Sequence, residues 1–180
     1  MDYNQFEFKN KPTIDEILSY QNLFISGMIG SGKSVLLHQI VGDIMAKKGL
    51  IRFTLYIYDP NKFEFYHRND HSIENLVLGS NEQDAITFLR NEIARRSFLS
   101  MAEMDNEKTI VFISEDFSFS NLEKFLMSIY RETTKLKILL ILAAQQKNAY
   151  ISNKSVLDHG TVFFINDPDG NDYRTIVVNK

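Results

Sequence analysis

The segment that most constrains the fold is the glycine-rich stretch at residues 27–34, which reads Gly-Met-Ile-Gly-Ser-Gly-Lys-Ser. This order matches G-x-x-x-x-G-K-[ST], the pattern of a loop that binds the phosphates of a nucleotide. Glycines let such a loop turn tightly and bring its backbone N–H groups against phosphate oxygens. The residues expected to contact the nucleotide are Gly27, Gly30, Ser31, Gly32, Lys33, Ser34 and Val35.

Two side chains of this loop predict the bound cofactors. The ammonium of Lys33 is expected to reach the β- and γ-phosphates, which gives Lys33 a catalytic as well as a binding role. The hydroxyl of Ser34 is expected to ligate Mg²⁺. The loop therefore predicts ATP and Mg²⁺ as cofactors.

The segments on either side of the loop support this prediction. Residues 22–26 form a short apolar run, which is typical of a buried strand. Residues 33–48 predict a helix that ends before Gly49. A phosphate at the N-terminus of a helix meets unsatisfied N–H groups and the positive end of the helix dipole. The alternative, a glycine-rich turn that binds nothing, does not require this order of strand, loop and helix.

Strand-like and helix-like segments alternate along the rest of the chain. The other predicted strands are 53–58, 75–78, 109–114, 138–144, 161–166 and 173–178, and the other predicted helices are 81–103, 121–134 and 153–158. The central strands are apolar throughout, which is typical of a parallel sheet covered on both faces. The sequence thus predicts a mostly parallel α/β sandwich in one domain over residues 13–180, after a loose N-terminal arm at residues 1–12.

Composition narrows the function further. The chain has no cysteine, so disulfides and thiolate metal sites are excluded. No apolar run reaches the ~20 residues of a membrane helix, and the N-terminus lacks the basic and apolar regions of a signal peptide. A cytoplasmic location is therefore expected. The net charge of −3 argues against a globally basic nucleic-acid binder, although a ring of subunits still has room for a locally basic channel.

An acidic site is expected beside the nucleotide. ATP hydrolysis needs a carboxylate near the Mg²⁺ shell and another that polarises the attacking water. The apolar run 110–113 is followed by Ser114, Glu115 and Asp116. Because Ser114 occupies the position of the usual first acid, we predict Glu115 as the catalytic base and Asp116 as the acid on the metal side. The alternative is that both carboxylates merely begin a polar loop.

Three further polar residues attract interest. Gln145 directly follows the apolar run 138–144, and the carboxyl ends of strands are where α/β folds bind ligands. We predict that Gln145 senses the γ-phosphate or orients the water, the alternative being an ordinary loop glutamine. Arg95 and Arg96 follow Glu92 on the helix predicted at 81–103, and we expect both arginines on a solvated face.

A set of short motifs, taken in order, resembles the FtsK/SpoIIIE (FtsK/HerA-like) family of motor ATPases. The motifs cover nearly the whole chain, which makes the set far more specific than the phosphate loop alone. They are Pro12–Leu18, Asn22–Val35, Tyr58–Tyr66, Asn91–Arg96, Ile141–Gln146 and Asp172–Ile176.

The resemblance implies a RecA-like (ASCE) P-loop core in which the Gln145 strand lies between the strands of the loop and of Glu115. It also implies a ring-shaped, usually hexameric ATPase that pumps double-stranded DNA, with relatives in conjugation, viral packaging and protein secretion. A neighbouring subunit is expected to supply an arginine finger, for which Arg131 and Arg174 are both candidates. A membrane or capsid protein is a further expected partner.

The chain also departs from the family pattern. Ser114 replaces the metal-shell Asp, and Ala144 and Gln146 replace the Thr and Arg beside Gln145. The chain is shorter than the usual motor domain and shows neither a membrane anchor before it nor a DNA-reading winged helix after it. The leading hypothesis is an ATP-driven DNA translocase. Two alternatives stay open: a nucleotide-binding module with weak or no hydrolysis that switches assembly, and a secretion-type ATPase that moves protein.

Overall fold

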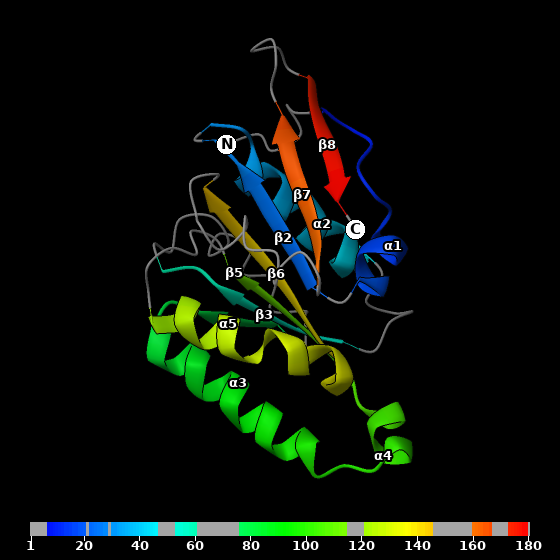
Figure 1. Cartoon of the computed structure of the whole chain (residues 1–180), viewed down its shortest axis with the longest axis vertical. Coiled ribbons are helices and arrows are strands. Elements are labelled where there is room, and N and C mark those ends of the chain that lie inside the picture. Colours follow the sequence, from blue (N-terminus) through cyan, green and yellow to red (C-terminus); the bar gives the residue numbers. More distant parts are fainter. Residues whose placement is uncertain are drawn as a thin grey trace.

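The computed structural model describes residues 7–20, 22–28, 30–46, 53–60, 76–114, 121–145, 160–166 and 173–179, and Figure 1 shows their arrangement. In chain order, the elements are β1 (Glu7–Lys9), α1 (Ile14–Ser19), β2 (Asn22–Gly27), α2 (Lys33–Ala46), β3 (Phe53–Tyr58), β4 (Leu76–Gly79), α3 (Glu82–Ser97), α4 (Met101–Asn106), β5 (Thr109–Ser114), α5 (Asn121–Thr133), the 3₁₀ helix η1 (Thr134–Leu136), β6 (Ile138–Gln145), β7 (Thr161–Asn166) and β8 (Tyr173–Asn179).

One sheet of eight strands organises the chain, in the order β1-β8-β7-β2-β6-β5-β3-β4. The six strands from β7 to β4 run parallel, β8 is antiparallel to β7, and β1 pairs parallel with β8. The prediction of a mostly parallel sheet is therefore confirmed. β6, which ends at Gln145, lies between β2 and β5, as the family resemblance implied.

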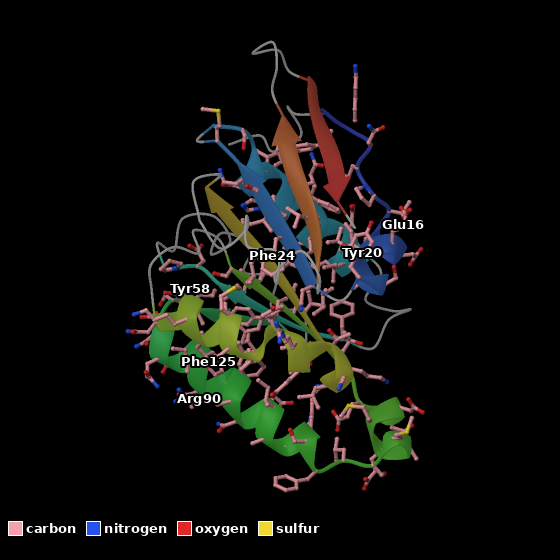
Figure 2. The ribbon with its side chains drawn as sticks, viewed as in Figure 1. Glu16, Tyr20, Phe24, Tyr58, Arg90 and Phe125 are labelled. Carbon is pink, nitrogen blue, oxygen red and sulfur yellow. The ribbon has the colours of Figure 1, made fainter. Side chains whose placement is uncertain are left out.

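Helices cover both faces of this sheet (Figure 1). On the α2 face, Leu37 and Ile40 of α2 join Ile25 and Val111 of the strands in one buried cluster. On the α5 face, Leu126 of α5 and Leu89 of α3 join strand residues such as Phe24, which Figure 2 labels. Burying an aliphatic or aromatic side chain of this size contributes about 1.5–3 kcal/mol, so these two clusters supply the main driving force for the sandwich.

α3 and α5 pack side by side on the α5 face. The guanidinium of Arg90 on α3 lies 5.2 Å from the ring centroid of Phe125 on α5, and both residues are labelled in Figure 2. The carboxylate of Glu82, the first residue of α3, accepts a hydrogen bond from the backbone N–H of Leu122 at the start of α5. None of the described helices is long and apolar enough to cross a membrane.

The helix predicted at 81–103 is wrong in its extent, because it divides into α3 and α4. Ser100 starts the second helix: its side chain accepts from the backbone N–H of Glu103, while the Glu103 carboxylate accepts from the backbone N–H of Ser100. Such a capping box stabilises a new helix start. The apolar pattern across this segment is continuous enough to hide the interruption.

Two short elements near the N-terminus were not predicted. β1 lies within the expected loose arm and pairs with β8, at Phe8 opposite Arg174. α1 begins after Thr13, whose side chain forms a second capping box with Glu16. The helix predicted at 153–158 and the end of the helix predicted at 33–48 lie outside the described residues.

Candidate functional site

The candidate site is the loop between β2 and α2, at the carboxyl edge of the parallel strands. Gly27 ends β2 and Lys33 begins α2. Gly30 and Gly32 have φ angles of 77° and 91°, in the left-handed region where residues with a Cβ are strained. These two positions explain why the loop needs glycine before its lysine.

A close approach explains the first glycine of the loop. A Cβ placed on Gly27 would lie 2.3 Å from the Oγ of Ser31, far inside van der Waals contact. The backbone N–H of Ser31 donates to the carbonyl oxygen of Met28 at 3.1 Å, which closes the turn. Ser31 is buried beneath this turn, so the loop is packed rather than open.

Lys33 lies across the loop that it terminates. Its Nζ donates to the carbonyl oxygens of Gly27 at 3.0 Å and Met28 at 2.9 Å. The first turn of α2 carries no acidic side chain, and the N-terminal end of a helix dipole favours anions. Val35 packs against the cluster on the α2 face and holds this first turn on the sheet.

These residues fit the triphosphate and the divalent cation that the sequence predicts. The loop sets an ammonium group and a helix N-terminus, two groups that favour anions, beside the same tight glycine turn. Ser34 follows Lys33 at the start of α2 and offers a hydroxyl oxygen, a hard ligand of the kind that Mg²⁺ prefers.

The strand that carries the predicted acidic site ends at Ser114, while Glu115 and Asp116 lie outside the described residues. Val111 and Ile113 belong to the cluster on the α2 face, whereas Ile110 and Phe112 belong to the cluster on the α5 face. Because side chains alternate along a strand, Ser114 is directed to the α5 side. Its hydroxyl is buried and has no hydrogen-bond partner among the residues that the structure describes, on the face opposite α2 and Ser34.

Gln145 lies beside the phosphate loop through its backbone. It is the last residue of β6 and pairs in register with Gly27, the first residue of the loop. The side chain of Gln145 lies outside the described part of the chain. Its place at the carboxyl end of the strand next to β2 is the one that the sequence predicted.

The expectation that Arg95 and Arg96 share a solvated face is wrong for Arg96, whose side chain is only 2% exposed. Its guanidinium donates to the carbonyl oxygens of Lys108 at 2.9 Å and Leu136 at 2.8 Å, and to the Glu92 carboxylate at 3.1 Å. Arg96 therefore ties α3 to the segment before β5 and to η1, at the amino edge of the sheet and far from the phosphate loop.

Arg95 is half-exposed and makes a double hydrogen bond to Glu107, at 2.6 Å and 2.8 Å. The hydrogen bonds to Glu107 and then to Glu92 raise the pKa of the Arg95 guanidinium, and the same contact with Arg95 lowers the pKa of Glu107. The pair of arginines thus serves the structure of this edge.

Sequence reasoning assigned no role to Asp59, the residue that directly follows β3. The structure buries it to 4% exposure at the same edge as the phosphate loop. An acid that directly follows an apolar strand is the signal that drew attention to Glu115, and the run 53–58 before Asp59 carries it too.

Comparisons with known proteins bear on the fold. No protein-family model matches the sequence, and no curated protein matches it. ATPases 2 and 3 of Thermomonospora curvata EccC, solved with a signal sequence peptide, match with a TM-score of 0.64 and 13% identity over 83% of this chain. The pCW3 conjugation coupling protein TcpA, solved with ATPγS, matches with a TM-score of 0.54 and 17% identity over 84% of this chain. B204, the DNA-packaging ATPase of Sulfolobus Turreted Icosahedral Virus, matches with a TM-score of 0.53 and 17% identity over 84% of this chain.

The chain has the fold of a RecA-like P-loop ATPase domain. The three neighbours are P-loop ATPases of the FtsK/HerA type. This chain spans 30% of the EccC chain, 50% of the TcpA chain and 78% of the B204 chain. At these low identities the likeness shows the fold alone.

Proposed function

We propose that this chain binds Mg·ATP at the loop between β2 and α2 and hydrolyses it to move a polymer, with duplex DNA as the leading candidate. The observation that carries the proposal is the position of Lys33. Its ammonium donates to the carbonyl oxygens of Gly27 and Met28 at the N-terminus of α2, where a phosphate would accept hydrogen bonds from Lys33 and from the N–H groups at the start of the helix.

Each predicted residue has a proposed task. Lys33 and the backbone of Gly30, Ser31 and Gly32 bind the phosphates, and Ser34 ligates Mg²⁺. When bound, Mg²⁺ neutralises charge on the β- and γ-phosphate oxygens.

The residues at the strand ends are proposed to serve the hydrolytic step. Asp116 holds the outer shell of the metal, Glu115 takes a proton from the attacking water, and Gln145 senses the γ-phosphate. The register of Gln145 with Gly27 supports the last assignment, because it brings β6 against the loop.

Duplex DNA is favoured by two of the structural neighbours. TcpA is a conjugation coupling protein and B204 is a DNA-packaging ATPase. A ring of this chain, proposed as a hexamer, would let each subunit present an arginine to the next subunit's nucleotide. Arg131, exposed on α5, and Arg174 in β8 are the proposed fingers, and a membrane or capsid protein is proposed to recruit the ring from the cytoplasm.

Protein is the second candidate polymer, and a specific observation favours it. EccC has the higher TM-score of the three neighbours, and it is a type VII secretion ATPase solved with a signal sequence peptide. A third possibility is a nucleotide-dependent assembly switch with little turnover, which the replacement of the usual acid by Ser114 motivates.

One experiment separates these functions: ATP turnover by the purified chain with and without long duplex DNA. A DNA motor is expected to hydrolyse ATP faster when duplex is present. If duplex DNA does not change the rate of ATP turnover, the result would favour a secretion-type ATPase. If the chain binds ATP but does not hydrolyse it, the result would favour the assembly switch.

A further inference from the structure

Asp59 differs from the other acidic side chains in its burial. Among the residues that the structure describes, it is the one Asp or Glu in the buried class. A buried carboxylate is costly unless neighbouring groups compensate its charge, and such groups concentrate at functional sites. The exposed aspartates of α3 and α4, by contrast, have no such cost.

Pairing within the sheet fixes where Asp59 lies. Its backbone N–H donates to the carbonyl oxygen of Gly79 at 2.8 Å, which continues the pairing of β3 with β4 by one residue. On the other side, β3 pairs with β5, and Tyr58 is in register with Ser114. Asp59, which follows the Tyr58 labelled in Figure 2, therefore lies next to the end of β5 at the carboxyl edge.

The side chain of Asp59 is directed to the α2 face. Phe53, Leu55 and Ile57 of β3 belong to the cluster on that face, and alternation along the extended chain continues to Asp59. Ser114, in the neighbouring strand, is directed to the opposite face. Asp59 thus supplies negative charge on the side of α2 and Ser34, where Ser114 supplies none.

We infer that Asp59 is a further residue of the nucleotide site and that it accepts a hydrogen bond from the water that attacks the γ-phosphate. This inference rests on the proposed function. Neighbouring strands lie about 4.8 Å apart, so the end of β3 is about 5 Å from β5 and about 14 Å from β2. Those spacings put Asp59 three strands away from the loop, on the far side of β6 and β5 from Ser34.

The chemistry that Asp59 would assist is a simple displacement. The oxygen of the water bonds to the γ-phosphorus as the bond from that phosphorus to the β,γ-bridging oxygen breaks. One proton of the water passes to the general base, and Asp59 holds the other O–H. A carboxylate in this position orients the water, and its charge also opposes the charge of the γ-phosphate.

The test is Asp59→Asn, with affinities for ATPγS and ADP measured by calorimetry in the presence of Mg²⁺. Removing a charge that faces the γ-phosphate is expected to raise the ratio of ATPγS to ADP affinity by about three- to tenfold. ATP turnover is expected to fall at least about tenfold. Asp84→Asn, at an exposed aspartate of α3, is the control and is expected to change neither quantity.

Other outcomes would overturn the inference. The inference would be overturned if Asp59→Asn left the ratio of ATPγS to ADP affinity unchanged. It would also be overturned if both affinities fell equally and the unfolding temperature fell too, because Asp59 would then have only a structural role. If Asp59→Asn does not fold, the variant to test is Asp59→Glu, which keeps the negative charge but moves it by one methylene group. ATP turnover at the wild-type rate in Asp59→Glu would also overturn the inference. Failure of the wild-type chain to bind ATPγS would instead refute the proposed function, and this inference with it.

Discussion

Single residues in this chain differ in how replaceable they are, and the phosphate loop shows why. Gly30 and Gly32 are required by their backbone angles, while Gly27 is required by the approach of Ser31. Lys33 is proposed to be required for its charge, since its ammonium lies on the carbonyl oxygens of Gly27 and Met28 at the N-terminus of α2, where a phosphate is proposed to bind. We therefore expect a change at the lysine to affect binding more than folding.

Lys33→Ala removes the main positive charge proposed for the β- and γ-phosphates. Charge-assisted hydrogen bonds contribute about 1.5–3 kcal/mol each, so we expect at least a tenfold loss of Mg·ATP affinity in calorimetry. Lys124→Ala, which removes an exposed lysine of α5, is the matched control and should bind normally. Unchanged ATP binding by the Lys33 variant would contradict the site.

Glu115→Gln keeps the shape of the proposed base and removes its basicity. General-base catalysis contributes about 10²–10⁴-fold, so this variant is expected to bind Mg·ATP normally and lose most of its turnover. Asp116→Asn should lower turnover less. The reverse ranking in steady-state assays would show that the acidic segment after β5 is aligned one residue out of place.

At the scale of elements, Arg96 joins three segments that are distant in sequence. It is buried on α3 and donates to carbonyl oxygens on the segment before β5 and on η1. A buried carbonyl group needs a hydrogen-bond donor, and Arg96 supplies one to each of these carbonyl groups. A guanidinium donates in several fixed directions at once, so it can reach both carbonyl groups, whereas the compact ammonium group of a lysine cannot.

Arg96→Leu is expected to cost about 3–5 kcal/mol of unfolding free energy, because it removes a buried guanidinium that donates to Glu92 and to the carbonyl groups of Lys108 and Leu136. Arg95→Leu removes an adjacent guanidinium that is half-exposed, and should cost about 1 kcal/mol or less. Urea unfolding followed by circular dichroism measures both. Equal losses in the two variants would contradict the structural role assigned to Arg96.

At the scale of the whole molecule, the net charge of −3 gives one subunit little electrostatic attraction to DNA, so we do not expect a single subunit to bind it strongly. A ring can gather a few lysines and arginines from each subunit into one pore, where their phosphate contacts add. Association and DNA binding should therefore depend on each other and on nucleotide.

We expect a monomer or loose oligomer without nucleotide, and a ring when Mg·ATP and duplex DNA are both present. ATP turnover per subunit should rise with protein concentration, because a neighbour is proposed to supply the arginine finger. For a ring that makes at least about six phosphate contacts, DNA affinity should fall about 10³-fold between about 50 and 200 mM salt. Analytical sedimentation and ATP turnover, both measured at two salt concentrations, test this expectation. ATPase activity that is proportional to protein concentration at both salt concentrations would argue against a ring.

The sequence by itself predicted the glycine-rich loop between a strand and a helix, and the α/β class, both of which the structure contains. Both depend on local patterns: the spacing of glycines before Lys33, and apolar runs long enough for buried strands. The order of β2, β6 and β5 was also anticipated, although through a family resemblance and not from the residues alone.

Only the tertiary structure decided which side chains face each other across the sheet. Strand neighbours that are distant in sequence determine three features of the structure. They are the burial of Arg96, the position of Asp59 beside β5, and the direction of the Ser114 side chain toward α5. β1 and β8, which lie near opposite ends of the sequence, pair with each other. No pattern in the residues of either segment alone indicates this pairing. A local pattern specifies how a segment folds, whereas the environment of a side chain is set by whatever the sheet brings next to it.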